Sequence, residues 1–292
     1  MPKPVRKAVF PVAGLGTRFL PATRAVPKEL VPVLDRPVLQ WVVEEAKEAG
    51  IEEFIFVTAR GKEAIADHFD AHPELEQTLA ARGKDDLLKA VRAAAIPAGK
   101  AIYVRQDAPK GLGHAIACAA AVVGDEPFAV LLPDMLMRAE PGCLTGMMDR
   151  YAQTGGNIIA VEEVPREEVH RYGVVALDEN APEALRITAM VEKPPVEEAP
   201  SNLIISGRYI LQPDIFDHLA QTTPGAGGEI QITDAMQRAL TAGAPYHAWR
   251  FTGETFDCGV KLGFLLANFA FGLADAETAP ALRAYAERLL RD

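Results

Sequence analysis

Short apolar strand patterns alternate with helical patterns through the first half of the chain, and this alternation restricts the possible folds more than any other feature. The segments AVFPVA, EEFIFVTA, AIYVRQ and PFAVLLPD have the β-branched character of buried strands. Between them, PVLQWVVEEAKEAG, KEAIADHFD and GHAIACAAAVV have helical periodicity. Strands joined through helices run parallel in one sheet with helices on its faces. We therefore predict an α/β fold with a mainly parallel sheet.

The second half of the chain has a different pattern. After about Gly156 the strand segments NIIAVEEV, YGVVALD, RITAMVEK and NLIISGRYIL are separated mainly by turns, which predicts antiparallel members and a mixed sheet. Helical segments then close the chain, and the last of them, APALRAYAERLL, is amphipathic and suited to packing or oligomer contact. Residues 73–95 are predicted to be an inserted helical segment with a break near Gly83.

Charge and cysteine usage exclude several classes of protein. The 292 residues carry 30 Lys and Arg against 40 Asp and Glu, a formal charge of -10 that repels nucleic acid and anionic membranes. No apolar run approaches a membrane span, and the N-terminus lacks a signal-peptide pattern, so we expect a cytoplasmic protein. The three cysteines, Cys118, Cys143 and Cys258, are too far apart for a CxxC site and are expected to be reduced. Because the net charge is negative, any site that binds an anion must be a local cluster of positive charge.

One such local site is predicted in the segment FPVAGLGTRFLPATRAVPKEL. Gly14 and Gly16 follow a strand and allow backbone N–H groups to approach phosphate oxygens, while Arg18 and Lys28 supply positive charge within a proline-stiffened loop. A dinucleotide fingerprint would need Gly or Ala where Phe19 stands, and no GK[ST] of a P-loop is present. The residue types alone are equally compatible with two solvated surface cations.

Asp134 is a second candidate, because it ends the apolar run FAVLLPD. This position lies at the carboxyl end of a predicted buried strand, where open α/β sheets bind ligands. A helix cap or a turn is the alternative role for an aspartate in such a place.

Taken together, these segments resemble the sugar-phosphate nucleotidylyltransferases, in particular the branch that uses UTP and glucose 1-phosphate. The resemblance starts at GLGTRFLPATRAVPKEL and continues in order through RQDAPKGLGHAI, LLPDM, YGVV, VEKP, SNLIISGRYIL, GAGGEIQITDAM and FDCGVKLGFLLA. It covers nearly the whole chain, and eight ordered motifs are more specific than any single one. It implies a three-layer α/β/α Rossmann-like nucleotidyltransferase fold.

The reaction that the resemblance implies joins UTP and glucose 1-phosphate to give UDP-glucose and pyrophosphate. An oxygen of the sugar phosphate attacks the α-phosphorus in line, so the protein must position two polyanions and stabilise the leaving group. The motifs assign this work to five residues, with Mg²⁺ as the cofactor: Arg18, Lys28, Asp134, Lys193 and Asp257. Asp134 and Asp257 match the aspartates that hold the metal.

The resemblance also implies two groups of binding residues. The nucleotide-binding group consists of Ala13, Gly14, Gly16, Thr17, Gln106 and Gly111. The sugar-binding group consists of Gly173, Glu192, Gly207 and Glu229. By residue type alone, a Glu-Lys pair is more often solvated surface, and isolated glycines are more often turn or bulge residues. His114 lies in the same motif as Gly111 but receives no catalytic role.

For the chain as a whole, the resemblance implies one nucleotidyltransferase domain over 1–292. Its expected parts are a nucleotide-binding half (1–156), a sugar-binding half (157–259) and C-terminal helices (260–292) that form a homodimer or homotetramer. Two alternatives stay open: a dTTP-dependent thymidylyltransferase, and a non-catalytic nucleotidyltransferase-like regulatory module. The GLGHA segment and the insertion at 73–95 favour UTP over dTTP, and the retained charged residues favour an enzyme. An NAD-dependent oxidoreductase is disfavoured by Phe19.

Overall fold

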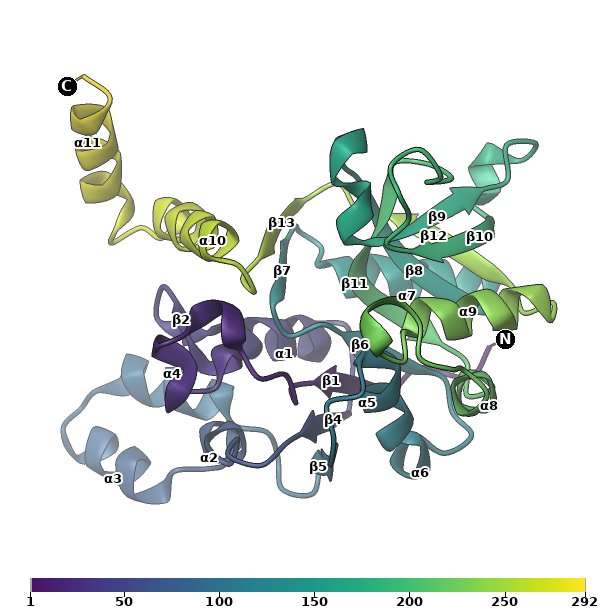
Figure 1. Ribbon diagram of the computed structural model, residues 1–292. Helices are drawn as coiled ribbons and strands as arrows, with labels where there is room; N and C mark the ends of the chain where they lie inside the picture. The colour runs from purple at the N-terminus through teal and green to yellow at the C-terminus, as the bar shows by residue number, and fades with distance from the viewer. Residues whose placement is uncertain (1, 292) are drawn as a thin grey trace.

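The first half of the chain forms the parallel part of one large sheet. The computed structural model describes residues 2–291. β1 pairs in parallel with β4 and with β6, and β4 pairs in parallel with β5. The elements concerned are β1 (Lys7–Pro11), α1 (Val38–Glu48), β4 (Glu53–Thr58), α2 (Ala64–Phe69), β5 (Ala101–Arg105), α5 (Leu112–Cys118), α6 (Ala120–Val123) and β6 (Phe128–Leu131). The predicted strand and helix alternation is confirmed (Figure 1).

The second half adds strands of both directions to the same sheet. These are β8 (Asn157–Glu163), β9 (Gly173–Leu177), β10 (Ile187–Glu192), β11 (Leu203–Leu211) and β12 (Tyr246–Arg250). β11 runs antiparallel to β6, β8 and β9, whereas β12 runs parallel to β8. Within residues 2–291 the result is a nine-stranded sheet in the order β10-β9-β11-β6-β1-β4-β5, with β8 on β11 and β12 on β8. The predicted mixed sheet is confirmed.

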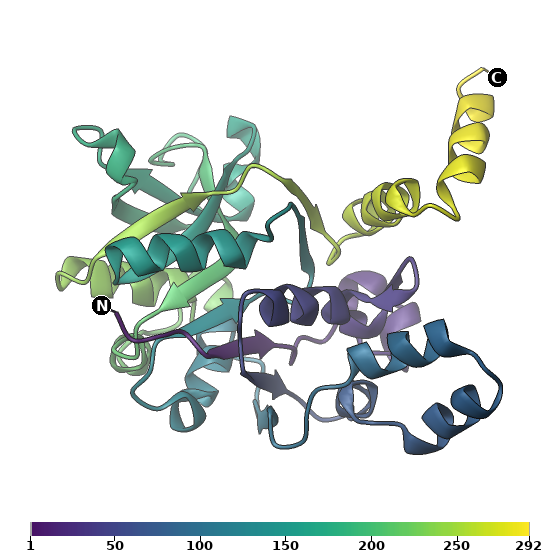
Figure 2. The same ribbon diagram turned by 180° about the vertical axis from the view of Figure 1, so that it is seen from behind.

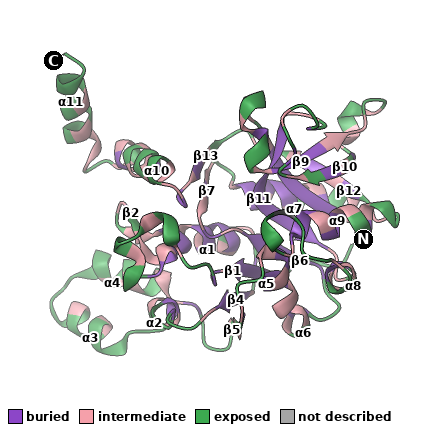
Figure 3. Ribbon diagram, viewed as in Figure 1, coloured by how far each residue is buried: buried purple, intermediate pink, exposed green. Residues whose placement is uncertain are grey.

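The sheet is the middle of three layers because alternate residues of each strand face opposite sides. In β4, Phe54 and Phe56 join one apolar cluster, whereas Ile55 and Val57 join the other. The first cluster includes residues of α1 and α7 (Cys143–Thr154), and the second includes residues of α5, α8 (Ile215–Ala220) and α9 (Ile232–Thr241). Figure 3 shows the central strands buried between the partly exposed helices.

Two helical parts lie outside these layers. The insertion is a pair of helices, α3 (Pro73–Ala81) and α4 (Asp85–Ala94), that contains no fully buried residue. Gly83 stands between them with φ +62°, so the predicted break is confirmed. At the other end of the chain, α10 (Lys261–Ala274) and α11 (Ala279–Leu289) extend away from the sheet (Figure 2).

The remaining elements are short. They are two antiparallel ribbons, β2 (Pro32–Val33) with β3 (Arg36–Pro37) and β7 (Met135–Arg138) with β13 (Glu254–Asp257), and 3₁₀ turns η1 (Thr17–Phe19), η2 (Ala22–Arg24), η3 (Lys28–Leu30), η4 (Arg166–Arg171), η5 (Pro182–Ala184) and η6 (Ala226–Gly228). No helix in the described part of the chain has the length and apolarity needed to cross a bilayer. The division of the chain at 156 and 259 stays a prediction; β11 pairs with strands on both sides of the first boundary.

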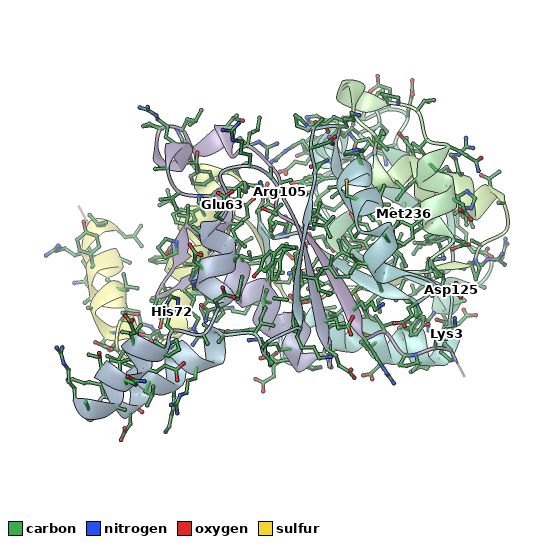
Figure 4. All side chains as sticks on the ribbon, turned by 90° about the horizontal axis from the view of Figure 1, so that it is seen from below. Lys3, Glu63, His72, Arg105, Asp125 and Met236 are labelled. Atoms are coloured by element: carbon green, nitrogen blue, oxygen red, sulfur yellow. The ribbon has the colours of Figure 1, made fainter. Side chains whose placement is uncertain are left out.

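Ion pairs on the surface contribute little to this fold. Lys3 lies 3.3 Å from Asp125, and Arg105 lies 3.0 Å from Glu63; all four side chains are more than half exposed (Figure 4). Exposed pairs of this kind are worth about 0–1 kcal/mol, because water and salt screen them. The two apolar clusters on the faces of the sheet therefore carry most of the stability.

Gly146 offers a test of how tightly α7 packs on the sheet. A Cβ at this buried position would lie 2.8 Å from Cε2 of Trp249 in β12. We expect Gly146→Ala to lower the free energy of unfolding by about 1–3 kcal/mol through overpacking, although alanine favours a helix. Urea denaturation measures the change. Gln153→Ala on the exposed side of α7 is the control, and an equally stable Gly146→Ala variant would show that Trp249 moves freely.

Candidate active site

The loop after β1 folds back so that Lys28 lies against the first glycine. Gly16 has φ +66°, a left-handed conformation that glycine adopts without steric cost, and its carbonyl accepts a 2.7 Å hydrogen bond from the Thr23 hydroxyl. A Cβ at Gly14 would lie 3.5 Å from Cε of Lys28 and 3.8 Å from its Nζ. The backbone of Gly14 and the ammonium group of Lys28 therefore lie next to each other, as the sequence predicts.

Lys28 is held there by the carboxylate at the end of β6. Its Nζ donates a 2.5 Å hydrogen bond to Oδ2 of Asp134, and both side chains are about three-quarters buried. Burial by itself would lower the pKa of Lys28, but the negative charges of Asp134 and Glu29 hold that pKa above its ordinary value. Burial likewise works against an ionised Asp134, yet Lys28 keeps the pKa of Asp134 below its ordinary value. Both groups are charged at neutral pH.

Asp257 is brought to the same place by the ribbon of β7 and β13. In this ribbon Met135 is opposite Asp257, and the N–H of Cys258 donates a 2.7 Å hydrogen bond to the carbonyl of Asp134. A Cβ at Gly259 would lie 2.8 Å from Oδ2 of Asp134 and 2.9 Å from Oδ1 of Asp257. The two carboxylates thus flank one point, and glycine leaves that point free of a side chain.

The electrostatics of this pair suit a divalent cation. The pKa of Asp257 is raised, first by burial and then by the negative charge of Asp134. Carboxylate oxygens are the ligands that Mg²⁺ prefers, and Mg²⁺ commonly uses one or two of them together with phosphate oxygens and water. The described residues contain no group of three or more His, Cys, Asp or Glu side chains that could hold a metal. The two carboxylates that flank one open point are compatible with Mg²⁺ bound together with phosphate oxygens and water.

Arg18 belongs to the same cluster. Its side chain is exposed, and its positive charge acts on Lys28, Asp134 and Asp257. Lys28, Asp134 and Asp257 are thus brought together, and Arg18 is near enough for its charge to act on all three. The fifth predicted catalytic residue, Lys193, lies with the sugar-side group described below.

Beside this cluster lies a cavity of about 390 Å³. Its wall is formed by the loop after β1, the end of β5, the start of α5 and the end of β6, which are carboxyl ends of strands and the turns that follow them. Eight of the predicted residues line it: Ala13, Gly14, Thr17, Lys28, Gln106, Gly111, Asp134 and Glu229. The predicted nucleotide group thus meets at one cavity, with Gly16 in the loop beside it.

Gly111 explains why Glu229 reaches this cavity. Gly111 has φ +102°, and a Cβ there would lie 2.7 Å from Cβ of Glu229. The neighbouring backbone is joined by two hydrogen bonds of 2.8 Å each, from Ile230 to Lys110 and from Gly113 to Ile230. The structure therefore places Glu229 on this cavity, beside predicted nucleotide-binding residues, whereas the sequence reasoning grouped it with the sugar side; its role stays a prediction.

A second group forms at the ends of β9 and β10. A Cβ at Gly173 would lie 3.1 Å from Oε2 of Glu192, and the Thr233 hydroxyl donates a 2.7 Å hydrogen bond to the same oxygen. Lys193 has φ +47°, unusual for a side-chain-bearing residue, and its Nζ lies 3.4 Å from Oε1 of Glu192. Thr233 was missed by the sequence reasoning, although the quoted motif GAGGEIQITDAM contains it.

This sugar-side group adjoins the carboxylate cluster. The negative charge of Asp257 is one of the influences, after burial, on the raised pKa of Tyr172, which precedes Gly173. Gly207 has φ +84°, and a Cβ there would lie 3.1 Å from Leu132 and from Met135, the residues on either side of Pro133 and Asp134. Tyr172 is therefore close enough to Asp257 to respond to its charge, and Gly207 lies against the residues that flank Pro133 and Asp134.

Comparison with known proteins decides the family. A family model described as nucleotidyl transferase matches residues 7–269. This chain belongs to the nucleotidyl transferase family. The resemblance predicted from the eight motifs is confirmed.

Relatives of this nucleotidyl transferase are similar over nearly their whole length. UTP–glucose-1-phosphate uridylyltransferase of Bacillus subtilis (strain 168) is 49% identical over 288 residues, covering 99% of this chain and 98% of the relative. The protein of the same name from Komagataeibacter xylinus is 47% identical over 262 residues, covering 90% of this chain and 92% of the relative. The structure of UTP-bound UGPase from Acinetobacter baumannii is 44% identical with a TM-score of 0.87, covering 98% of this chain and all of that chain.

Among solved structures, UDP-glucose pyrophosphorylase complexed with UDP-glucose is 42% identical to this chain. The TM-score is 0.84, and the match covers 93% of this chain and all of the other. The predicted three-layer fold with a mixed sheet is thereby confirmed.

The Asp134 loop of this nucleotidyl transferase is supported by a buried arginine that the sequence reasoning missed. Arg208 of β11 is fully buried, and its Nη2 lies 2.8 Å from Oε2 of Glu45 in α1. Its guanidinium also donates to the carbonyls of Met135 at 2.8 Å and Leu132 at 3.3 Å. These two carbonyls lie on either side of Asp134 in the chain, so the arginine holds the loop that carries Asp134 in one position. The quoted segment ISGRY contains Arg208 without any signal that it is buried.

A second buried ion pair supports Lys28. Glu29 is 1% exposed, and its two carboxylate oxygens accept hydrogen bonds of 2.7 and 2.8 Å from Nζ of Lys62. Lys62 follows β4, so this pair fastens η3 to the neighbouring strand end. Burial raises the pKa of Glu29 and lowers the pKa of Lys62. Both shifts reflect the free energy needed to remove the two charged groups from water.

The Arg208–Glu45 pair can be tested as a unit. We expect Arg208→Met to lower the free energy of unfolding by about 3–5 kcal/mol, because it leaves a buried carboxylate without its partner. The free energy of unfolding should fall less in the double variant Arg208→Met, Glu45→Met than the summed losses of Arg208→Met and Glu45→Met, since neither charge is then left without its partner. Urea denaturation of all four proteins measures this coupling. Additive losses would contradict the interaction.

Proposed function

We propose that this protein transfers the uridylyl group of UTP to glucose 1-phosphate, with UDP-glucose and pyrophosphate as products. An oxygen of the sugar phosphate forms a bond to the α-phosphorus of UTP. The bond from the α-phosphorus to the bridging oxygen breaks, and its electrons leave with pyrophosphate. The observation that carries the proposal is the convergence of Lys28, Asp134 and Asp257 beside the cavity that holds Gln106 and Gly111.

Positioned charge is what this reaction requires of the protein. The attacking oxygen is already an anion, so no general base is needed, and two polyanions must be brought together. Lys28 is held at the cavity by Asp134 before any substrate binds, so its ammonium needs little reorganisation when phosphate arrives. Arg18, which is exposed at the same cluster, is suited to the departing pyrophosphate because its planar guanidinium offers several donors.

The proposed cofactor is Mg²⁺, held by Asp134 and Asp257. Bound there, it would offset the negative charge of the phosphates. The proposal is supported by the two carboxylate oxygens that flank the open point beside Gly259, and by the raised pKa of Asp257 next to its like-charged neighbour.

The sugar-side group would orient glucose 1-phosphate. Glu192 is fixed by the Thr233 hydroxyl and can accept hydrogen bonds from sugar hydroxyls. Lys193 is about half exposed and can contact the sugar phosphate with its mobile ammonium group. On the other side, Gln106 and the backbone at Gly111 would contact the uracil base.

The direct test is pyrophosphate release by the purified chain with UTP, glucose 1-phosphate and Mg²⁺. We expect release that depends on both substrates and stops when the metal is chelated. Replacing UTP by dTTP is the discriminating arm, and a clear preference for dTTP would contradict the substrate assignment.

Asp134→Asn tests the metal-holding role. We expect this variant to lose pyrophosphate release by about a hundredfold or more, because one charged ligand and the partner of Lys28 are lost together. Thermal unfolding should show an intact fold. Asp217→Asn on the exposed surface of α8 is the matched control, and normal turnover by Asp134→Asn would rule out the role.

We also propose that the protein forms a homodimer or homotetramer through its C-terminal helices. Leu262, Leu265, Leu266 and Phe269 lie on one side of α10 at helical spacing, and each is between 44% and 67% exposed. An apolar stripe of this kind on a helix that extends away from the sheet is suited to the same stripe of a second copy (Figure 1).

The assembly has a simple test. The double variant Leu262→Glu, Leu265→Glu should have the 31.5 kDa mass of one chain by light scattering, whereas the unmodified protein should have two or four times that mass. Leu87→Glu on the exposed surface of α4 is the control. A monomeric unmodified protein would contradict the proposal.

The proposed compartment is the cytoplasm. Cys118, Cys143 and Cys258 are free thiols, as expected in a reducing environment.

A further inference from the structure

The carboxamide of Gln106 has a defined orientation in the wall of the cavity. Its Nε2 donates a 3.2 Å hydrogen bond to the carbonyl oxygen of Gly111 and lies 2.9 Å from Nδ1 of His114. A backbone carbonyl can only accept hydrogen bonds, so the side of the amide that faces Gly111 must be the NH₂ group. The amide nitrogen is therefore turned toward the start of α5, and the oxygen points elsewhere.

The same contacts favour one tautomer of the neutral His114 ring. Because Nε2 of Gln106 is a donor, Nδ1 of His114 must accept, and the proton of the neutral ring is on its other nitrogen. The Sγ of Cys118 lies 4.0 Å from the same Nδ1. Burial raises the pKa of the Cys118 thiol, so this neighbour is also a donor. Two donors thus face one lone pair.

We propose that His114 is a positioning residue for base recognition: its Nδ1 holds the Gln106 carboxamide so that the oxygen, not the nitrogen, is presented to the base. The inference rests on the proposed function and deepens it. His114 is not among the residues that line the described cavity, and it acts through Gln106, which does line it.

The chemical consequence is a preference for one class of base. Uracil has an N–H at position 3, which can donate to the carboxamide oxygen. Cytosine has a lone pair at this position, which meets that oxygen as acceptor against acceptor. Turning the amide over to suit cytosine would place its oxygen against the Gly111 carbonyl, so that hydrogen bond would be lost, and it would keep the His114 contact only if the ring changed to its less favoured tautomer. Thymine has the same N–H as uracil, so this device does not separate UTP from dTTP.

Two substitutions of His114 separate the lone pair from the ring. His114→Asn keeps an acceptor oxygen near the position of Nδ1 but removes the ring. His114→Phe keeps a ring of similar shape but removes the acceptor. If the lone pair is what matters, the asparagine variant should resemble the unmodified protein and the phenylalanine variant should not.

The measurement is kcat/KM for UTP and for CTP in pyrophosphate release, with the KM for glucose 1-phosphate as an internal reference. We expect His114→Phe to reduce the UTP-to-CTP ratio about three- to tenfold, the range of one hydrogen bond. The loss should be in the KM for UTP, with little change in kcat or in the KM for glucose 1-phosphate. His114→Asn should keep most of the ratio.

An unchanged UTP-to-CTP ratio in His114→Phe would overturn the inference. So would a larger decrease of this ratio in His114→Asn than in His114→Phe. An equal decrease in both variants, accompanied by a lower melting temperature, would also overturn it. Calorimetric binding of UTP and CTP to the same three proteins gives a readout that does not depend on turnover. If the unmodified protein binds UTP over CTP but releases no pyrophosphate, the proposed reaction fails while the role of His114 is still tested.

Discussion

The contact between the Lys28 ammonium and the Asp134 carboxylate is the interaction around which the site is built. Two partly buried carboxylates flank one point, and the pKa of Asp257 is raised first by burial and then by the negative charge of Asp134. Lys28, which donates a hydrogen bond to Asp134, offsets part of the cost of burying these negative charges. The cluster sets the two carboxylates of Asp134 and Asp257 against the positive charges of Lys28 and Arg18, which is compatible with the proposed metal and phosphate ligands.

Residues that do not touch this point keep it in place. Arg208 holds the two carbonyls that bracket Asp134, and Lys62 holds Glu29, the residue that follows Lys28 in the chain. Both are buried ion pairs, which contribute little net stability but impose one geometry, since a shifted loop would leave a charge buried and unpaired. The ribbon of β7 and β13 then adds Asp257 through backbone hydrogen bonds.

Much of the fold could be predicted because it depends on local patterns. Alternating strands and helices, the later strands joined by turns and the break at Gly83 are properties of neighbouring residues, and the structure has each of them. That most of the proposed nucleotide-side residues line one cavity could also be predicted, since the glycines and Gln106 stand in contiguous motifs at strand ends. The grouping of Glu229 could not be predicted, because its position depends on hydrogen bonds between segments more than a hundred residues apart.

The sequence alone determined the α/β class, and it predicted a phosphate-binding role for the loop that contains Gly14 and Lys28, because propensity, periodicity and residue chemistry are local. The tertiary structure decided which of these residues meet. Positions 28, 134 and 257 converge through strand pairing and the β7–β13 ribbon, and burial converts Arg208 from an ordinary strand residue into a support. The reason is physical: distance and desolvation arise only when distant segments pack together, and these two quantities set the charges at the site.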